Sequence, residues 1–308
     1  MATNTIAVIT AENKTFYDKK LIKRMLPQVH FYNDAQKRTL PTKNGTTIDF
    51  RLFNGLSIPE ASLTEGVTPA GKSLNVTNMT AVVKQEGDFI EVSDMLKKAG
   101  IDQVTSEATD ILSEQASLTI DTRIQQALLT GTNVSYSGGK TSSTLTKTDV
   151  ITELDIKKLA RKLKKANAKK FSDGYYHAIV DPDQAFDIMN LAGWVDIGKY
   201  VNGTQLLKGE IGKMYGIRFM ESTNLQTEEV GLNDAKFTKH KAFAYGADSY
   251  GVVELDGNGK PEIIVKDLGS SGTADALNQR ATVAWKACFT AKILQPACVI
   301  RLETAVSV

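Results

Sequence analysis

The three histidines, His30, His177 and His240, are the side chains in this sequence best suited to proton transfer or metal binding near neutral pH. They lie far apart in the chain and have no metal-ligand spacing. His177 lies on a predicted strand shortly before Asp181, an arrangement that suits an acid–base pair. A partly buried histidine with local hydrogen bonds explains the same residues more simply. We therefore predict no catalytic and no metal-binding residue.

Two glycine-rich segments partly resemble ligand-binding loops. Residues 138–141, Gly-Gly-Lys-Thr, resemble the end of a phosphate-binding loop, but that motif requires glycine at the position of Val134. Residues 256–260, Asp-Gly-Asn-Gly-Lys, fail as a calcium loop because the fifth residue is lysine and no bidentate acid follows at the required place. We interpret the first as a flexible loop and the second as a turn. We expect no cofactor and no enzymatic activity, and a nucleotide-binding enzyme using the first segment is the alternative of another class.

The composition is that of a soluble globular protein, with 42% hydrophobic and 23% charged residues in a chain of 308. The formal net charge is +2, so strong binding to nucleic acid would need a local basic patch. The N-terminus lacks the apolar run of a signal peptide, and no stretch reaches the ~18 apolar residues of a membrane span. Cys288 and Cys298 have no metal or redox spacing and indicate buried thiols in a reducing, cytoplasm-like compartment.

The first third of the chain predicts elements that cannot be stable alone. Residues 1–45 have little periodicity and are expected to form an extended arm, either loose or lying on a neighbour. Residues 46–53 and 74–83 alternate like strands on either side of a polar segment rich in Gly, Pro, Ser and Thr. They predict a long projecting β-hairpin, with a third strand at 88–92. Such a hairpin has too little apolar surface to be stable without a partner.

The remaining elements predict a mixture of helices and sheets. Apolar residues at helical spacing predict a long helix over 101–129, ended by Gly131 and followed by a loop over 132–148. A capping box at residues 152–155 opens a second helix, which continues to about residue 168. Next come predicted strands at 175–180 and 216–220, with a helix from Pro182 to about Met189 between them. The last elements predicted are a hairpin of 252–255 and 262–265 through the turn at 256–259, and strands at 283–293 and 299–302.

The second helix carries the highest density of positive charge in the chain. Leu154, Leu159 and Leu163 predict a narrow apolar stripe on it. Its charged residues, which we call the basic ridge, are Lys157, Lys158, Arg161, Lys162, Lys164 and Lys165. The ridge could face a polyanion or the acidic residues of a neighbouring subunit. A solvated helix face explains it equally well, and no aromatic residues interleave it as a nucleic-acid platform would require.

Four segments resemble the N4-type family of tailed-phage major capsid proteins. They are PEASLTEGVTP at 59–69, VVKQEGDFIEVSD at 82–94, GEIGKMYGI at 209–217 and QRATVAWK at 279–286. The first is fairly specific, whereas the third recurs across many capsid families. Together they extend over most of the chain from about residue 45.

This resemblance implies an α+β chain with the HK97-like phage capsid fold. By analogy, residues 1–45 are the N-terminal arm, 46–93 the extended loop, 94–150 and 246–308 the peripheral domain with its spine helix, and 151–245 the axial domain. Any scaffolding protein is expected to be a separate chain. The residues expected to contact a neighbouring subunit, at the hairpin tip, are Pro59, Leu63, Glu65, Val67 and Pro69.

The resemblance also implies a function, namely self-assembly into pentamers and hexamers of an icosahedral head. The expected partners are copies of the same chain, a portal, separate scaffolding or decoration proteins and weakly held double-stranded DNA. The expected location is the virion capsid, after assembly in the host cytoplasm. An encapsulin-like nanocompartment shell with the same fold is an alternative, and a DNA-binding module that uses the basic ridge is another.

Overall fold

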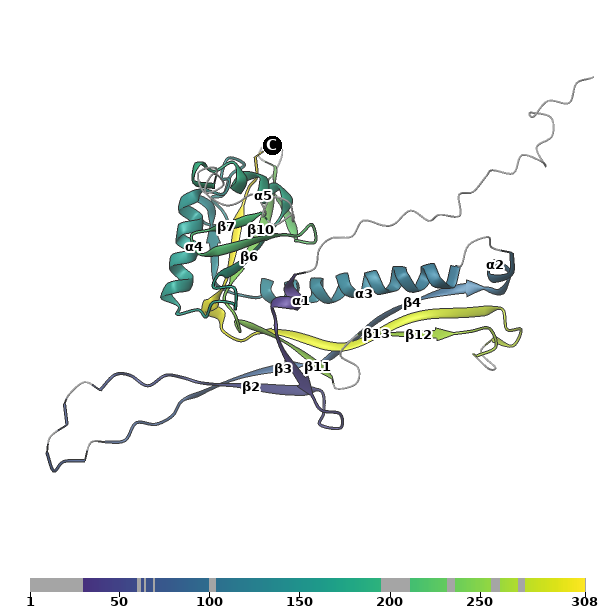
Figure 1. Ribbon diagram of the computed structural model, residues 1–308, viewed down its shortest axis with the longest axis horizontal. Helices are drawn as coiled ribbons and strands as arrows, with labels where there is room; N and C mark the ends of the chain where they lie inside the picture. Colours follow the sequence, from purple (N-terminus) through teal and green to yellow (C-terminus); the bar gives the residue numbers. More distant parts are fainter. Residues whose placement is uncertain are drawn as a thin grey trace, which may run out of the picture.

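The computed structural model describes residues 30–307 except 60–61, 64, 69, 100–103, 195–210, 232–235, 256–260 and 271–274. Three parts are visible in Figure 1: a long platform of one helix on a sheet, a block of helices around a second sheet, and a projecting hairpin. No helix in the described ranges is both long and apolar enough to cross a bilayer.

The platform consists of helix α3 (Val104–Leu129) on a five-stranded sheet, the platform sheet. Its strands are β1 (Gln36–Leu40), β11 (Tyr250–Leu255), β13 (Arg280–Ile293), β12 (Glu262–Lys266) and β4 (Lys84–Ser93). Side chains of β13 alternate between buried and partly exposed, as its sequence predicts. The buried ones, Val283, Trp285, Ala287 and Phe289, share a core with α3.

Helix α3 buries an apolar residue at every fourth position from residue 108 to 128. The stripe is Ala108, Leu112, Ala116, Ile120, Ile124 and Leu128. Four residues turn an α-helix by about 40° more than a full turn, so the stripe winds slowly around the helix. The helix therefore contributes to one core that contains residues of both sheets. The predicted helix is confirmed over 104–129, and its expected start at 101 lies outside the described residues.

The expected hairpin of residues 252–255 and 262–265 is not formed. Both β11 and β12 run antiparallel to β13 along the same edge, while β4 occupies its other edge. Glu254 lies opposite Phe289 and Glu262 opposite Lys286, so the two strands follow one another along β13. The two strands therefore run in the same direction along β13, and the predicted turn at 256–259 lies outside the described residues. The long alternating surface of β13 outcompetes the local turn preference of this segment.

The second sheet, the block sheet, has the order β5–β14–β10–β6–β8–β7, with β9 paired to β10. Helices α4 (Glu153–Lys165) and α5 (Pro182–Met189) pack on one face, and α3 and α1 (Phe31–Asp34) pack on the other. Both capping boxes form, at Thr152 with Asp155 and at Asp181 with Gln184. The strands are β5 (Val134–Tyr136), β14 (Val299–Thr304), β10 (Phe237–Tyr245), β6 (Tyr176–Val180), β8 (Ile217–Glu221), β7 (Gly212–Met214) and β9 (Thr227–Val230).

The projecting hairpin consists of β2 (Thr47–Phe53) and β3 (Val76–Val82), paired antiparallel from Thr47 with Val82 to Phe53 with Val76. Residues 54–75 continue beyond the paired strands (Figure 1). The extended loop was expected to reach residue 93, but β4 is paired with β13 along its whole length and belongs to the platform sheet. Helix α2 (Asp94–Ala99) and two short 3₁₀ turns, Ser137–Gly139 and Pro296–Cys298, complete the described elements.

Residues 30–40 pack on the rest of the chain, although they were expected to belong to an extended arm that is either loose or lies on a neighbour. Phe31 is buried and makes an edge-to-face contact with Phe243, with ring centroids 5.5 Å apart. Strand β1 pairs in parallel with β11. A buried aromatic side chain and a full strand ladder offset the entropy of ordering this segment. The part of the expected arm before residue 30 lies outside the described residues.

Candidate functional site

The outer part of the hairpin exposes large apolar side chains. Ile58 is 86% exposed, Leu63 78% and Val67 63%. Pro59 and Glu65 are also exposed, and Pro69 lies outside the described residues. Soluble proteins rarely expose such a cluster unless it binds a partner. The predicted contact residues that the structure describes are therefore all exposed on the outer part of the hairpin.

The base of the hairpin is fixed to the platform, which sets the direction in which its tip projects. Ile48 and Phe50 of β2 pack against a small buried cluster of Leu40, Val83 and Val253. Near the tip, Lys72 Nζ donates to the carbonyl oxygen of Ser57 at 2.6 Å. The hairpin is thus anchored at one end, and its apolar outer residues have no such cluster beneath them.

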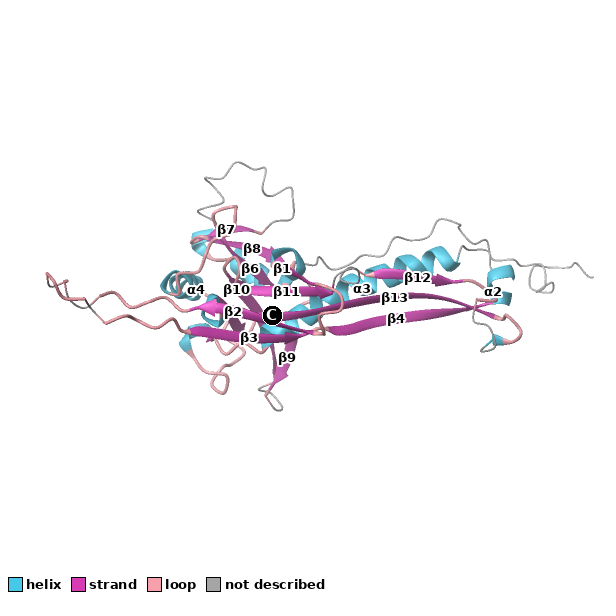
Figure 2. Ribbon diagram, turned by 90° about the horizontal axis from the view of Figure 1, so that it is seen from below, coloured by secondary structure: helices cyan, strands magenta, loops and turns pink. Residues whose placement is uncertain are grey.

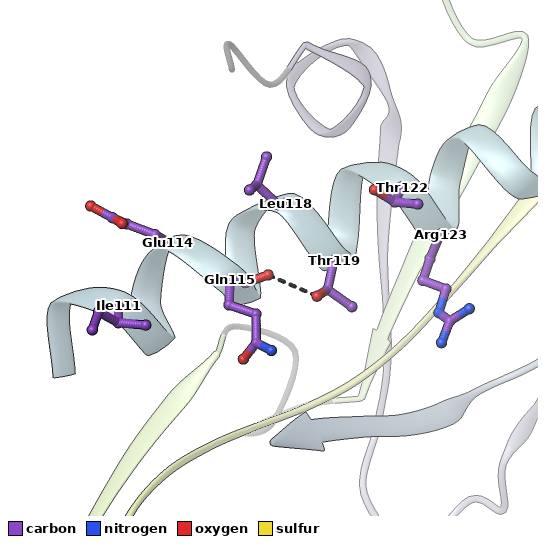
Figure 3. A pocket seen from close by; sticks show the side chains of 7 residues that line it. All are labelled: Ile111, Glu114, Gln115, Leu118, Thr119, Thr122 and Arg123. Carbon is purple, nitrogen blue, oxygen red and sulfur yellow. Dashed lines mark hydrogen bonds between the residues drawn. The ribbon is translucent and has the colours of Figure 1, made fainter. Parts of the chain in front are cut away.

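The outer face of α3 has a shallow concavity of about 500 Å³ (Figure 3). Its apolar lining comes from Ile111 and Leu118, and its polar lining from Glu114, Gln115, Thr119, Thr122 and Arg123. Gln115 and Arg123 point toward the sheet, where they bond Asp88 and Glu86 of β4. These bonds hold the walls of the concavity in place, while Leu118 points away from the sheet (Figure 3). The sequence predicted the helix but not this surface.

Two of the six cations of the basic ridge on α4 form ion pairs within the described chain. Lys157 pairs with Glu153 at 2.6 Å, and Lys158 with Asp155 at 3.4 Å. The pKa of Glu153 is lowered by hydrogen bonds from Lys157 and Tyr215. Lys162 lies 3.4 Å from Ser135 Oγ. The ridge is thus smaller in effective charge than its sequence indicates.

The outer ridge, which we define as Arg161, Lys164 and Lys165, is exposed and forms no ion pair with any described residue. The apolar stripe behind the ridge differs from the predicted one, because Leu154 is 59% exposed. Ile156, Leu159, Ala160 and Leu163 form the buried face instead. Leu159 and Leu163 are buried as predicted, and Ile156 takes the place expected for Leu154.

The segments considered for chemistry have local partners. Lys140 Nζ lies 2.7 Å from Asp149 Oδ2, so the lysine of the glycine-rich loop is paired with a carboxylate of its own chain. Helix α4 begins well after this loop, at Glu153, which is not the geometry of a phosphate-binding loop. Asp181, Asp183 and His240 place three possible ligand atoms within 4.8 Å, a grouping that the sequence did not indicate. Asp181 caps the N-terminus of α5, whose positive dipole end disfavours a cation there.

His177 was considered as a partner of Asp181, and the structure separates them. Asp181 bonds His240, with Oδ2 2.9 Å from Nδ1. His177 instead lies between Asp34 and Asp173. The partly buried, locally bonded histidine that we expected is present, but its Asp34 partner is far away in the sequence.

A family model described as phage capsid protein matches residues 76–302, well over half of the chain. The chain belongs to the phage capsid protein family. No curated protein matches it by sequence. Membership in this family explains why the hairpin tip exposes apolar side chains, since neighbouring subunits of a capsid cover such surfaces.

Solved capsid structures share the fold over the full chain. The capsid of cyanophage P-SCSP1u has a TM-score of 0.74 at 14% identity, covering 100% of this chain and 97% of that one. The head of Helicobacter pylori bacteriophage KHP40 has a TM-score of 0.74 at 11% identity, covering 100% of both chains. The capsid of Ralstonia phage GP4 has 0.73 at 14%, covering 100% and 99%. The predicted α+β, HK97-like capsid fold is confirmed.

Proposed function

We propose that this capsid protein is the major shell subunit of a tailed double-stranded DNA phage of the N4 type. Copies of the chain assemble into pentamers and hexamers that close an icosahedral head in the host cytoplasm. A portal and decoration proteins are its further partners in the head, and packaged DNA is held by weak contact only. The net charge of +2 is too small for tight non-specific binding to DNA, so the subunit is expected to enclose the DNA without binding it strongly.

The observation that carries this proposal is the anchored hairpin with an unsupported apolar tip. Residues 57–72 project away from every cluster of the described core, yet they expose Ile58, Leu63 and Val67. In a shell this tip lies on the peripheral domain of the next subunit. The concavity on α3 supplies a complementary apolar surface there, through Ile111 and Leu118. A contact between two different surfaces repeats around a ring and so builds a closed assembly.

We assign the parts of the chain to the roles that such a shell requires. Residues 1–29 serve as the arm and 46–83 as the extended loop. Residues 84–133 and 246–298 form the peripheral domain, with α3 as its spine. Residues 134–245 and 299–308, which include every strand of the block sheet, form the axial domain around the symmetry axes. The outer ridge on α4 is then placed for contact with acidic residues of the adjacent axial domain.

The first test removes residues 57–72. Asn54 N and Asn75 O are 3.0 Å apart, so the deletion leaves a short turn closing an intact β2–β3 hairpin. We expect a soluble, folded subunit that forms no closed shells in negative-stain images. Normal particles from this variant would refute the proposed role of the tip.

A matched pair of variants separates apolar contact from added charge. Leu63→Asp with Val67→Asp is expected to reduce the yield of closed shells by at least about tenfold, because an unpaired carboxylate cannot enter an apolar contact. Ser62→Asp with Thr68→Asp adds the same charge to the same tip and should leave assembly largely intact. Equal losses in both pairs would contradict the apolar contact. Nuclease-protected DNA inside shells distinguishes a phage head from an encapsulin-like compartment, which would hold cargo protein.

A further inference from the structure

His177 is hydrogen-bonded at both ring nitrogens, at the junction between the block sheet and the segment that enters it from the N-terminus. Its Nδ1 lies 2.8 Å from Asp34 Oδ2, and its Nε2 lies 3.1 Å from Asp173 Oδ2. The side chain is 8% exposed, and its ring stacks on Phe171 with centroids 3.8 Å apart. The ring is therefore held in one orientation.

Geometry alone sets the protonation state that this arrangement requires. A neutral imidazole has one N–H and can donate to one carboxylate only. Both carboxylates are acceptors when ionised, so two bonds need the imidazolium form. Losing the proton leaves one nitrogen lone pair facing a carboxylate, and one of the two bonds must be lost. The second proton of the His177 ring therefore links Asp34, next to β1, to Asp173 in the loop that precedes β6.

Every element around the ring supplies a charged or titratable group. Arg218 of β8 has Nη1 3.3 Å from Asp173 Oδ2. Tyr245 of β10 donates its hydroxyl to Asp34 Oδ2 at 2.8 Å. The pair of Lys169 and Asp248 lies at the rim, 2.9 Å apart. With the imidazolium present, the two carboxylates facing the ring are balanced by Arg218 and the ring; without it, one negative charge is unbalanced.

The same junction fixes residues 31–40, which we call the arm root. Phe31 N donates to Asp121 Oδ1 at 3.0 Å, and the Tyr250 hydroxyl donates to the carbonyl oxygen of Phe31 at 2.7 Å. Asp34 is the last residue of α1, shortly before β1 begins at Gln36. A cleft of about 370 Å³, lined by Asp34, Asp173, His177 and Arg218 among others, opens beside the ring. Solvent protons therefore have a route to a group that is otherwise nearly buried.

We propose that His177 is a proton-dependent latch that holds the arm root on the block sheet, closed with the imidazolium and weakened when the ring loses its proton. The latch is a property of the single chain and does not depend on the proposed shell contacts. In an assembly it would make the docking of the arm root sensitive to alkaline conditions.

The direction of the pH dependence follows from the two carboxylates. Burial opposes the imidazolium, but hydrogen bonds and charge from Asp34 and Asp173 outweigh it, so the pKa of His177 is raised above its ordinary 6.5. A raised pKa in the folded state means that the stabilisation is complete below pH 6.5 and is lost as pH rises through the raised value. The latch therefore opens as the pH rises above 6.5.

Trypsin cleavage at Lys37 and Arg38 of the full-length chain measures the latch, because both are exposed on the arm root. The cleavage rate of the chain at each pH is divided by the cleavage rate of a peptide of residues 30–45. This ratio corrects for the pH dependence of trypsin itself. We expect the wild-type ratio to rise about tenfold from pH 6.5 to 9.5, the factor for one hydrogen bond to a charged group. His177→Gln should show the fast ratio at every pH. His240→Gln, at a buried histidine outside the junction, should keep the wild-type profile.

A flat wild-type ratio would overturn the latch, and so would an unchanged pH profile in His177→Gln. A second measurement needs no variant to fold. In the wild-type chain with isotope-labelled histidine, NMR titration of His177 should show both ring nitrogens protonated at pH 6.5 and a midpoint above it. A midpoint at or below 6.5 would equally overturn the proposal.

Discussion

Lys239 of β10 is a cation buried between two carboxylates in the block sheet. Its side chain is 5% exposed, and its Nζ lies 3.0 Å from Glu303 Oε2 and 3.1 Å from Glu228 Oε2. Arg301 Nε bonds the other oxygen of Glu303 at 2.8 Å. Burial disfavours the ammonium, but the two carboxylates outweigh it and raise the pKa of Lys239. Glu303, which is also buried, depends on these two cations for its charge.

We therefore expect Lys239→Met to lower the free energy of unfolding by about 3 kcal/mol, because it removes one partner of a buried charge. The control is Lys236, an exposed residue just before β10 that pairs with Glu229 of β9. Lys236→Met should cost less than about 1 kcal/mol. Equilibrium urea unfolding of the unassembled chain measures both values. Similar losses in the two variants would show that Lys239 is not a specially buried charge.

At the scale of elements, α3 has two faces with different roles. The buried stripe ties the platform sheet to the block sheet through one core. The opposite face carries Ile111 and Leu118 in the shallow concavity. The face of a helix that lies opposite the core typically carries polar and charged residues. We relate the first face to folding and the second to contact with a neighbour.

Two isoleucine substitutions test this division. Ile124 is 0% exposed, and Ile124→Ala is expected to lower the free energy of unfolding by about 3 kcal/mol through lost burial and a cavity. Ile111→Ala should cost less than about 1 kcal/mol because that side chain is only partly buried. Thermal and urea unfolding of the unassembled chain give the comparison. A large loss from Ile111→Ala would place that residue in the core and argue against an assembly face.

At the scale of the whole molecule, the surfaces without partners lie on different parts of the chain. The hairpin projects from the platform, and helix α4, which carries the outer ridge, lies on the block (Figures 1 and 2). Contacts between unlike surfaces of this kind generate rings and closed shells. The outer ridge has three cations without an ion pair to any described residue, and the net charge of the chain is +2, which favours a local contact with a neighbour over tight binding to DNA.

Charge reversal of the outer ridge tests that choice. Arg161→Glu, Lys164→Glu and Lys165→Glu together should leave the subunit folded and reduce the yield of empty shells, because like charges would meet at the axial contact. Lys147→Glu, Lys266→Glu and Lys292→Glu change the net charge equally at other exposed positions. Shell yield from purified subunits is the measurement. Normal empty shells with reduced DNA retention would instead favour a polyanion as the partner of the ridge.

Local patterns in the sequence predicted most elements. The alternation over residues 283–293, the helical spacing before Gly131 and the capping box at 152–155 each depend on residues within a few positions of one another. Such signals are readable without knowing the fold. The hairpin tip, too, could be predicted from its composition, since it lacks the apolar surface to be stable alone.

Long-range pairing was decided only in the tertiary structure. The segment at 256–259 resembles a hairpin turn, yet β11 and β12 follow one another along β13 because that strand offers a longer apolar ladder. Strand β4, which was predicted to belong to the extended loop, pairs with β13 for the same reason. His177 meets Asp34 across 143 positions of sequence, a contact that no local pattern records. The sequence by itself determined the elements and their need for partners, and the free energy of packing between distant segments determined which surfaces remained for a neighbour.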